Sequence, residues 1–256
     1  MKLRISICVN SVYAGRDFVE SIYACAAAGV KAIDMWSWRE QDMEAVGRAL
    51  AQTGIQIAAM SAGCSKMVTP QDSAAFTGGI REAIAVADRV GCKTLIAGPG
   101  DAACGLSRGY QHDNIVSALK AAAPILADAG KTLVLEPLNT AVDHPKAYLW
   151  SSDEAYDILC EVDQPHIKML YDIYHQQIME GNVLSRIGRM LGRIGHFHAA
   201  GVPGRHELDG GELNYTAVLD AIRHAGYAGF VGLEYYPSEG MTPEEGFTPY
   251  LQRYGG

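Results

Sequence analysis

The chain has 256 residues, of which 48% are hydrophobic and 20% are charged, and its formal net charge at pH 7 is −8. This composition is typical of a soluble globular protein, and no apolar run approaches the ~18 residues of a membrane span, so a membrane protein is not expected. The acidic balance argues against nucleic-acid binding, which relies on lysine and arginine to neutralise phosphates.

The start of the chain interleaves charged residues with a short strand-like run and has no signal-peptide hydrophobic region, which predicts a cytoplasmic protein. The six cysteines are scattered without any Cys-x-x-Cys pair, so neither a zinc knuckle nor a redox dithiol is indicated. In a reducing compartment they are expected to be free thiols. The sequence leaves the oligomeric state open, and a homo-oligomer is compatible with it.

Short apolar runs alternate with segments of helical periodicity along the whole chain. The predicted strands cover residues 3–9, 32–36, 55–60, 94–97, 132–136, 167–172, 194–199 and 230–234. The predicted helices cover 17–28, 41–51, 72–90, 114–129, 152–161, 183–191 and 215–225, and several end at a glycine, which favours a left-handed cap. This alternation is typical of a parallel sheet. Eight strands in a chain of nearly the ~250 residues typical of the fold predict an α/β protein, a single (β/α)8 TIM barrel over residues 1–256.

In the first half of the chain, few side chains suggest a catalytic or ligand-binding role. Trp36 and residues 60–66 follow predicted strands, so they can line the mouth of a pocket or pack at its rim.

Each of the last four predicted strands carries a potential metal ligand at its end: Glu136, Asp172, His198 and Glu234. An unpaired charge buried in such a place costs several kcal/mol, roughly, unless a cation or another partner compensates it. The four residues recur at intervals of about one βα unit, so they are expected at the same end of consecutive parallel strands. Three carboxylates and one imidazole suit a divalent ion of the Mn, Mg or Co kind.

Each of these residues also has a structural alternative. Glu136 or Glu234 can pair with an arginine, Asp172 can cap a helix, and His198 can be a satisfied core histidine. His196 points to the same barrel face as His198 if the strand is regular, and is expected in a lower layer.

At these residues the chain resembles the hydroxypyruvate isomerase family of the xylose isomerase-like TIM-barrel superfamily. The matching motifs are LEPLN at 135–139, YDIYH at 171–175, MEG at 179–181, VPGRHE at 202–207, GELNY at 211–215 and GLEY at 232–235. The resemblance implies that the four predicted ligands hold a divalent metal and that Glu136 and Glu234 also act on the substrate. It further implies substrate contacts from His175 and Arg205. His198 stands where hydroxypyruvate isomerases usually have glutamine, and it looks like the ligand of ketose 3-epimerases.

The leading hypothesis is a divalent-metal-dependent isomerase that acts through an enediolate on a small hydroxy-keto acid or short sugar, as in hydroxypyruvate to tartronate semialdehyde. Glu136 and Glu234 are the expected acid and base. The planar fork of Arg205 suits a substrate carboxylate, although an ion pair with Glu207 or Asp209 is an alternative. The nearest rival function is a ketose 3-epimerase that uses the same site. A lyase or dehydratase, a phosphodiester nuclease and a non-catalytic sugar-binding barrel are further alternatives.

Overall fold

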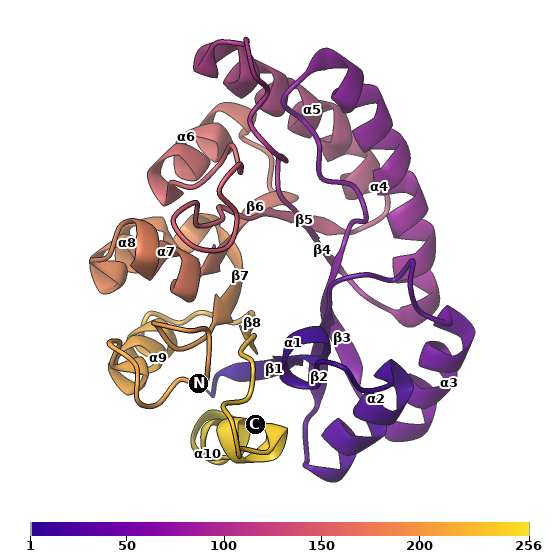
Figure 1. Ribbon diagram of the computed structural model, residues 1–256. Coiled ribbons are helices and arrows are strands. Elements are labelled where there is room, and N and C mark those ends of the chain that lie inside the picture. Colours follow the sequence, from indigo (N-terminus) through magenta and orange to yellow (C-terminus); the bar gives the residue numbers. More distant parts are fainter. Residues whose placement is uncertain (1, 256) are drawn as a thin grey trace.

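The computed structural model describes residues 2–255, which contain eight parallel strands closed into a barrel (Figure 1). The strands pair in chain order, and β1 pairs with β8 to complete the ring. The α/β class and the (β/α)8 TIM barrel predicted from the sequence are therefore confirmed. The strands are β1 Arg4–Cys8, β2 Ala32–Met35, β3 Gln56–Ser61, β4 Thr94–Ala97, β5 Thr132–Leu135, β6 Ile167–Asp172, β7 Ile194–Ala199 and β8 Phe230–Leu233.

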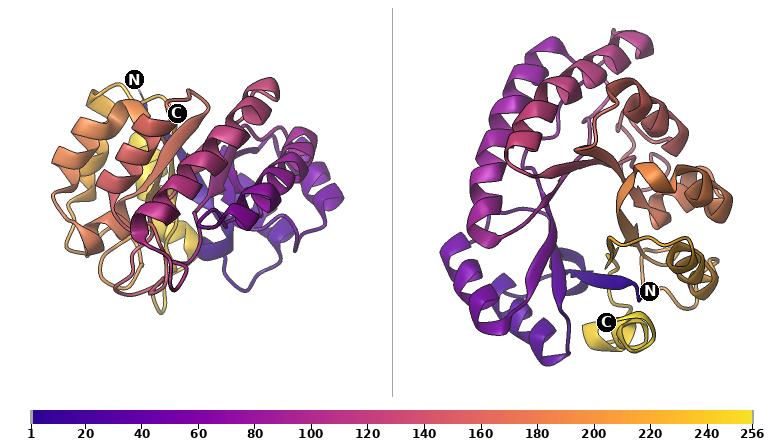
Figure 2. Two further views of the ribbon diagram at one scale, coloured as in Figure 1. Left: turned by 90° about the horizontal axis from the view of Figure 1, so that it is seen from above. Right: turned by 180° about the vertical axis from the view of Figure 1, so that it is seen from behind.

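Helices form an outer ring around the strands (Figure 1), and the two ends of the chain lie close together in both views of Figure 2. The last helix packs against the first strand, so the end of the chain helps to cover the point where the barrel closes. The helices are α1 Val9–Val12, α2 Phe18–Ala27, α3 Met43–Thr53, α4 Pro70–Val90, α5 Arg108–Asp128, α6 Ser152–Val162, α7 Ile173–Met179, α8 Val183–Met190, the 3-10 turn η1 Leu191–Arg193, α9 Tyr215–His224 and α10 Pro243–Tyr254.

The seven predicted helices are all present, with their ends shifted by a few residues. The largest shift is at the start of α5, where the Ser107 side chain accepts a hydrogen bond from the Tyr110 backbone and so caps the helix six residues earlier than predicted. Three helices, α1, α7 and α10, were not predicted from the sequence. Of these, α10 carries a recognisable signal, because Thr242 and Glu245 form a capping box around Pro243.

The barrel interior has an apolar half and a polar half. The apolar half is a small cluster, separate from the main core between strands and helices, with one residue from each of β3 to β6: Ala59, Ile96, Val134 and Leu170. The polar half is formed by the neighbouring strands β7, β8, β1 and β2, whose contacting residues are Ser6, Asp34, His196, His198 and Gly232. Within this layer of the barrel, the charged groups therefore lie on the side of β7, β8, β1 and β2.

Across residues 2–255, every helix is too short or too polar to cross a lipid bilayer. All six cysteines are free thiols, as predicted.

Candidate metal and catalytic site

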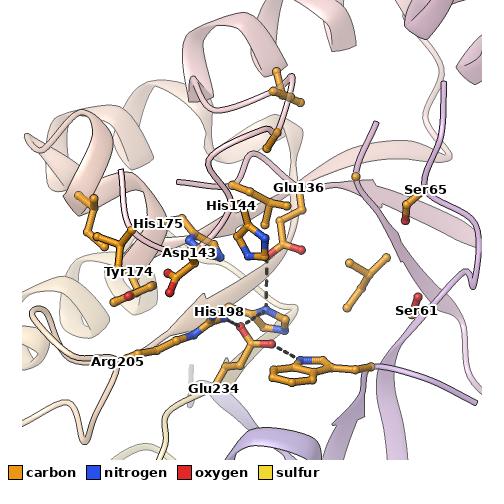
Figure 3. A pocket seen from close by; sticks show the side chains of 18 of the residues that line it. Ser61, Ser65, Glu136, Asp143, His144, Tyr174, His175, His198, Arg205 and Glu234 are labelled. Atoms are coloured by element: carbon orange, nitrogen blue, oxygen red, sulfur yellow. Dashed lines mark hydrogen bonds and ion pairs between the residues drawn. The ribbon is translucent and has the colours of Figure 1, made fainter. Parts of the chain in front are cut away.

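The four predicted ligands converge at the C-terminal ends of β5 to β8. Glu136, Asp172, His198 and Glu234 each offer one ligand atom, and these atoms lie within 4.8 Å of one another. His198 Nδ1 is 3.1 Å from Glu234 Oε2 and 3.8 Å from Glu136 Oε1. Figure 3 shows these three side chains facing one another at the bottom of a pocket. Parallel strands therefore place in one cluster the residues that the sequence separates by nearly one hundred positions.

The donor set fits a divalent cation. Asp172, His198 and Glu234 are almost fully buried, and three carboxylates in such a space repel one another unless positive charge lies among them. Both ring nitrogens of His198 are buried and lack a hydrogen-bond partner among residues 2–255, although carboxylates lie nearby. Oxygen donors with one imidazole are the ligands that Mn, Mg and Co accept.

Arg205 supplies positive charge to the same cluster. Its Nη2 lies 2.5 Å from Glu234 Oε2 and 3.7 Å from Asp172 Oδ2, and its guanidinium is 5.1 Å from the centre of the Tyr174 ring. The side chain is only 12% exposed, so these are buried charge contacts. Thus Glu234 does pair with an arginine, as one structural alternative required, while it remains within the ligand cluster.

The loop after β7 directs Arg205 inward. Arg205 has a backbone φ of +58°, and its amide donates to Gly201 O while its carbonyl accepts from the Tyr236 amide. The alternative ion pair with Glu207 or Asp209 is wrong. Glu207 instead accepts hydrogen bonds from the amide and hydroxyl of Ser238, and Asp209 accepts one from Tyr250. The left-handed turn at Arg205 therefore points the guanidinium toward the carboxylates.

The charges in the cluster shift one another's pKa values. Burial raises the pKa of Asp172 to about 6, although Arg205 opposes the shift. Burial also acts to raise the pKa of Glu234, but His198 and Arg205 outweigh it and hold this pKa well below its usual range. For His198, burial acts to lower the pKa, but the surrounding carboxylates, Glu234 foremost, raise it well above its usual range. A cation that binds here must displace one of the two ring protons of His198, because only the neutral imidazole is a ligand.

Asp172 has a second role, because it caps α7 and is supported by His175. Its Oδ1 accepts from the Tyr174 and His175 amides, which confirms that it is a helix cap. Asn139 Oδ1 accepts two backbone amides, so its Nδ2 must be the group that donates to His175 Nδ1, at 2.6 Å. The His175 proton therefore lies on Nε2, which is 3.4 Å from Asp172 Oδ2. This network orients both the helix cap and the carboxylate.

Two contributors come from β2 and the residues directly after it. Trp36 Nε1 donates to Glu234 Oε1 at 2.5 Å, so the prediction that Trp36 lines a pocket is confirmed. Asp34 was not predicted as a site residue, and its Oδ2 lies 3.2 Å from His196 Nε2 and 3.6 Å from His198 Nε2. It is a carboxylate within a buried apolar strand, which is the same signal that identified the other ligands. His196 lies in the layer below His198, as predicted.

The cluster opens into a cavity of about 760 Å³. Tyr174, His175 and Arg205 line it on the side of the second half of the chain, and Ser61 and Ser65 lie opposite them (Figure 3). The volume exceeds that of a three-carbon acid and is ample for a small sugar. The site therefore combines a cation-binding cluster, two glutamates, one guanidinium and hydroxyl groups across an open space.

The chain is similar to known proteins over nearly its whole length. A family model described as a xylose isomerase-like TIM barrel matches residues 22–248. The 2-oxo-tetronate isomerase of Cupriavidus necator is 32% identical over an alignment that covers 98% of this chain and 99% of that protein. The hydroxypyruvate isomerase of Escherichia coli is 27% identical over 252 residues, with 95% and 96% covered. A crystal structure described as an AP endonuclease, family 2, from Brucella melitensis matches with a TM-score of 0.92, 27% identity and 99% of each chain covered.

Proposed function

This chain belongs to the xylose isomerase-like TIM-barrel family, and from that premise we propose that it is a divalent-metal-dependent isomerase of small hydroxy-keto acids. The proposed reaction converts hydroxypyruvate to tartronate semialdehyde, or a homologous 2-oxo acid to its isomer. One observation carries the proposal: four ligand atoms from consecutive strands lie within 4.8 Å at the bottom of a cavity that Arg205 also lines. The names of the relatives from C. necator and E. coli support the same reaction class.

The proposed metal ligands are Glu136, Asp172, His198 and Glu234, and a bound cation of the Mn, Mg or Co kind supplies a Lewis acid that polarises the substrate ketone. Two of the ligands also serve in proton transfer. The Glu136 side chain is 14% exposed and lines the cavity, whereas Glu234 is held by Trp36 and Arg205. Two carboxylates in such different surroundings can divide the roles of base and acid.

The reaction moves protons and needs no redox cofactor. In hydroxypyruvate, one carboxylate removes a proton from C3, which leaves an enediolate across C2 and C3. A proton is then delivered to C2, and the C3 hydroxyl loses its proton as its oxygen becomes the aldehyde, while the oxygen on C2 gains one. The product has the same atoms as the substrate. Glu136 and Glu234 are the groups placed to exchange the carbon-bound proton.

The remaining polar groups of the cavity account for substrate recognition. The guanidinium of Arg205 presents a planar fork that suits a carboxylate, and its distance from Glu234 places it beside the reacting end of the substrate. His175 lines the same wall, and its Nε2 proton points toward the ligand cluster. We propose that Arg205 and His175 bind the substrate oxygens.

A substrate panel in D2O tests the function. Protein stripped with EDTA and reloaded with Mn²⁺ is incubated with hydroxypyruvate, a four-carbon 2-oxo acid and D-fructose, and the products are read by NMR after the metal is removed. Glu136→Gln and Glu234→Gln should lower turnover on the order of 100-fold or more, because each deletes one acid-base group. Glu239→Gln makes the same change at an exposed position and should behave as wild type.

Metal occupancy is measured for every variant, because loss of the cation lowers turnover by another route. A metal-replete double variant, Glu136→Gln with Glu234→Gln, that still incorporates deuterium at the wild-type rate would remove both residues from the mechanism. Wild-type protein that converts neither acid would refute the proposed substrate class.

A ketose 3-epimerase is the second candidate, and His198 favours it. Hydroxypyruvate isomerases usually carry glutamine at this ligand, whereas the ketose 3-epimerases carry histidine. The size of the cavity also permits a six-carbon ketose. In the same panel, inversion at C3 of D-fructose with deuterium incorporated at that carbon, and no conversion of either acid, would establish the epimerase instead.

A further inference from the structure

Asp34 is a buried carboxylate to which the proposed mechanism gives no part. It is 1% exposed and lies inside the polar half of the barrel, below the ligand cluster. Its Oδ2 accepts a hydrogen bond from Ser6 Oγ at 2.8 Å and lies 3.2 Å from His196 Nε2 and 3.6 Å from His198 Nε2. A charge buried at this depth is expensive, so these contacts indicate a specific task.

The two ring nitrogens of His198 face different partners. Nδ1 lies toward Glu234 and Glu136, at 3.1 and 3.8 Å, whereas Nε2 lies toward Asp34. A neutral imidazole carries its proton on one nitrogen and its lone pair on the other, so a hydrogen bond at one nitrogen decides which one can bind a cation. Asp34 Oδ2, at 3.6 Å, lies slightly beyond hydrogen-bond distance of Nε2, on the side from which an acceptor can hold the proton there.

We infer that Asp34 is a positioning residue, which accepts the Nε2 proton of His198 and so presents the Nδ1 lone pair to the cation. This inference rests on the metal site of the proposed function. Carboxylates that accept the second N–H of a metal-bound histidine fix the orientation of the ring and raise its basicity. Asp34 does not enter the ligand cluster, and it acts only through His198.

The surrounding structure restrains Asp34 in this position. Ser6 on β1 and His196 on β7 approach the same oxygen atom from two other strands, and the β2–β3 pairing shifts register between Ile33 and Asp34. Such a shift re-aims a side chain relative to a regular strand. His196 also meets the His198 ring edge to face, with ring centres 5.0 Å apart, and so limits its rotation.

Gly232 on β8 leaves the space that this contact needs. A Cβ atom at Gly232 would lie 2.1 Å from Asp34 Oδ2 and 2.8 Å from His198 Cδ2, both closer than non-bonded atoms approach. Any side chain at this position would therefore push the carboxylate and the imidazole apart. The glycine is explained by the Asp34–His198 contact, which supports a functional reason for that contact.

The test compares Asp34→Asn with Asp157→Asn, which makes the same change at an exposed position on α6. Zn²⁺ binding is measured by calorimetry, and the His198 ring nitrogens of the Zn²⁺-loaded protein are assigned by ¹⁵N NMR. Wild-type protein should bind one ion, with Zn²⁺ on Nδ1 of His198 and the proton on Nε2. Asp34→Asn should bind Zn²⁺ about 10- to 100-fold more weakly, whereas Asp157→Asn should not change.

A steric variant tests the same contact from the other side. Gly232→Ala should weaken Zn²⁺ binding as Asp34→Asn does, whereas Gly188→Ala, on the exposed face of α8 with open space around it, should not. If Asp34→Asn fails to fold, Ser6→Ala replaces it, because this variant removes only one hydrogen bond from Asp34 and should weaken binding several-fold.

Three results would overturn the inference: unchanged affinity in folded Asp34→Asn, Zn²⁺ on Nε2 of His198, or two ions per chain. The last result would mean that Asp34, His196 and His198 hold a second cation, since their donor atoms also lie within 4.8 Å of one another. Wild-type protein that binds no divalent ion would refute the proposed function instead.

Discussion

Substitution of Arg205 by alanine and by glycine separates its electrostatic role from its backbone conformation. Alanine removes the guanidinium from Glu234 and Asp172, and loss of one partner from a buried charge pair costs about 3 to 5 kcal/mol of unfolding free energy. In a protein of this size, that corresponds to a decrease in Tm of roughly 10 °C. Glycine removes the same charge but adopts the φ of +58° without the penalty of about 1 kcal/mol that a side chain incurs there. Arg205→Gly should therefore unfold a few degrees above Arg205→Ala.

The assay is thermal unfolding followed by circular dichroism, once in EDTA and once in saturating Mn²⁺. A cation among the carboxylates compensates their negative charge in place of Arg205. The decrease in Tm of both variants relative to wild type should therefore be smaller in Mn²⁺ than in EDTA. Arg193→Ala removes an arginine from a more exposed pair with Asp163 and should change Tm little in either buffer. If Arg205→Ala matches wild type in EDTA, or if Mn²⁺ leaves its deficit unchanged, the electrostatic reasoning is wrong.

Three further predictions concern protons and the Asn139 network. Because the carboxylates raise the pKa of His198 well above its usual range, Mn²⁺ binding at pH 7 should release about one proton. Calorimetry in buffers of different ionisation enthalpy counts the released protons, and a count of zero would contradict this expectation. Asn139→Ala deprives His175 Nδ1 of its donor and should weaken Mn²⁺ binding about tenfold through Asp172, whereas unchanged binding would show that His175 needs no support. Burial lowers the pKa of His175 to about 4, against about 6.5 in the unfolded chain. Between these two pH values the unfolded state binds one more proton than the folded state, so the free energy of unfolding decreases as the pH falls through that interval. Urea unfolding of His175→Gln should show a shallower decrease from pH 6.5 to 4 than wild type, and equal slopes would refute this account.

The strands and most helices of the fold could be predicted because hydrophobic periodicity records burial directly. Of the missed helices, α1 and α7 follow their strands directly and lack that record, whereas α10 carries it, with Phe247, Tyr250 and Tyr254 buried at helical spacing. Asp172 ends β6 and caps α7 with no loop between them, so the change from strand to helix periodicity has no visible boundary. At the start of α5, residues 108–113 are mainly polar, and the hydrogen bond from Tyr110 to the Ser107 side chain, rather than an apolar stripe, marks the first turn.

The ligand cluster could be predicted for a similar reason, because a charged group at the end of a buried strand demands a partner. The identity of each partner could not. Trp36 reaches Glu234 and Asp34 reaches His198 only because β1 pairs with β8 and closes the ring, and contacts across so many residues leave no local pattern. The direction of Arg205 depends on a positive φ at a residue other than glycine, which sequence rules do not anticipate.

The wall of the cavity opposite Arg205 is formed by residues other than the proposed metal ligands and acid-base groups. The loops after β3 and β4 are joined by a hydrogen bond from Met67 N to Pro99 O, and Gly100, with a φ of +91°, packs so closely that a Cβ atom there would lie 2.6 Å from Ser65 O. Ser61 and Ser65 face the cavity from this support, which shares no residue with the four proposed ligands. We therefore expect combinatorial libraries restricted to these two serines to alter the substrate range of the proposed reaction and to leave its type unchanged.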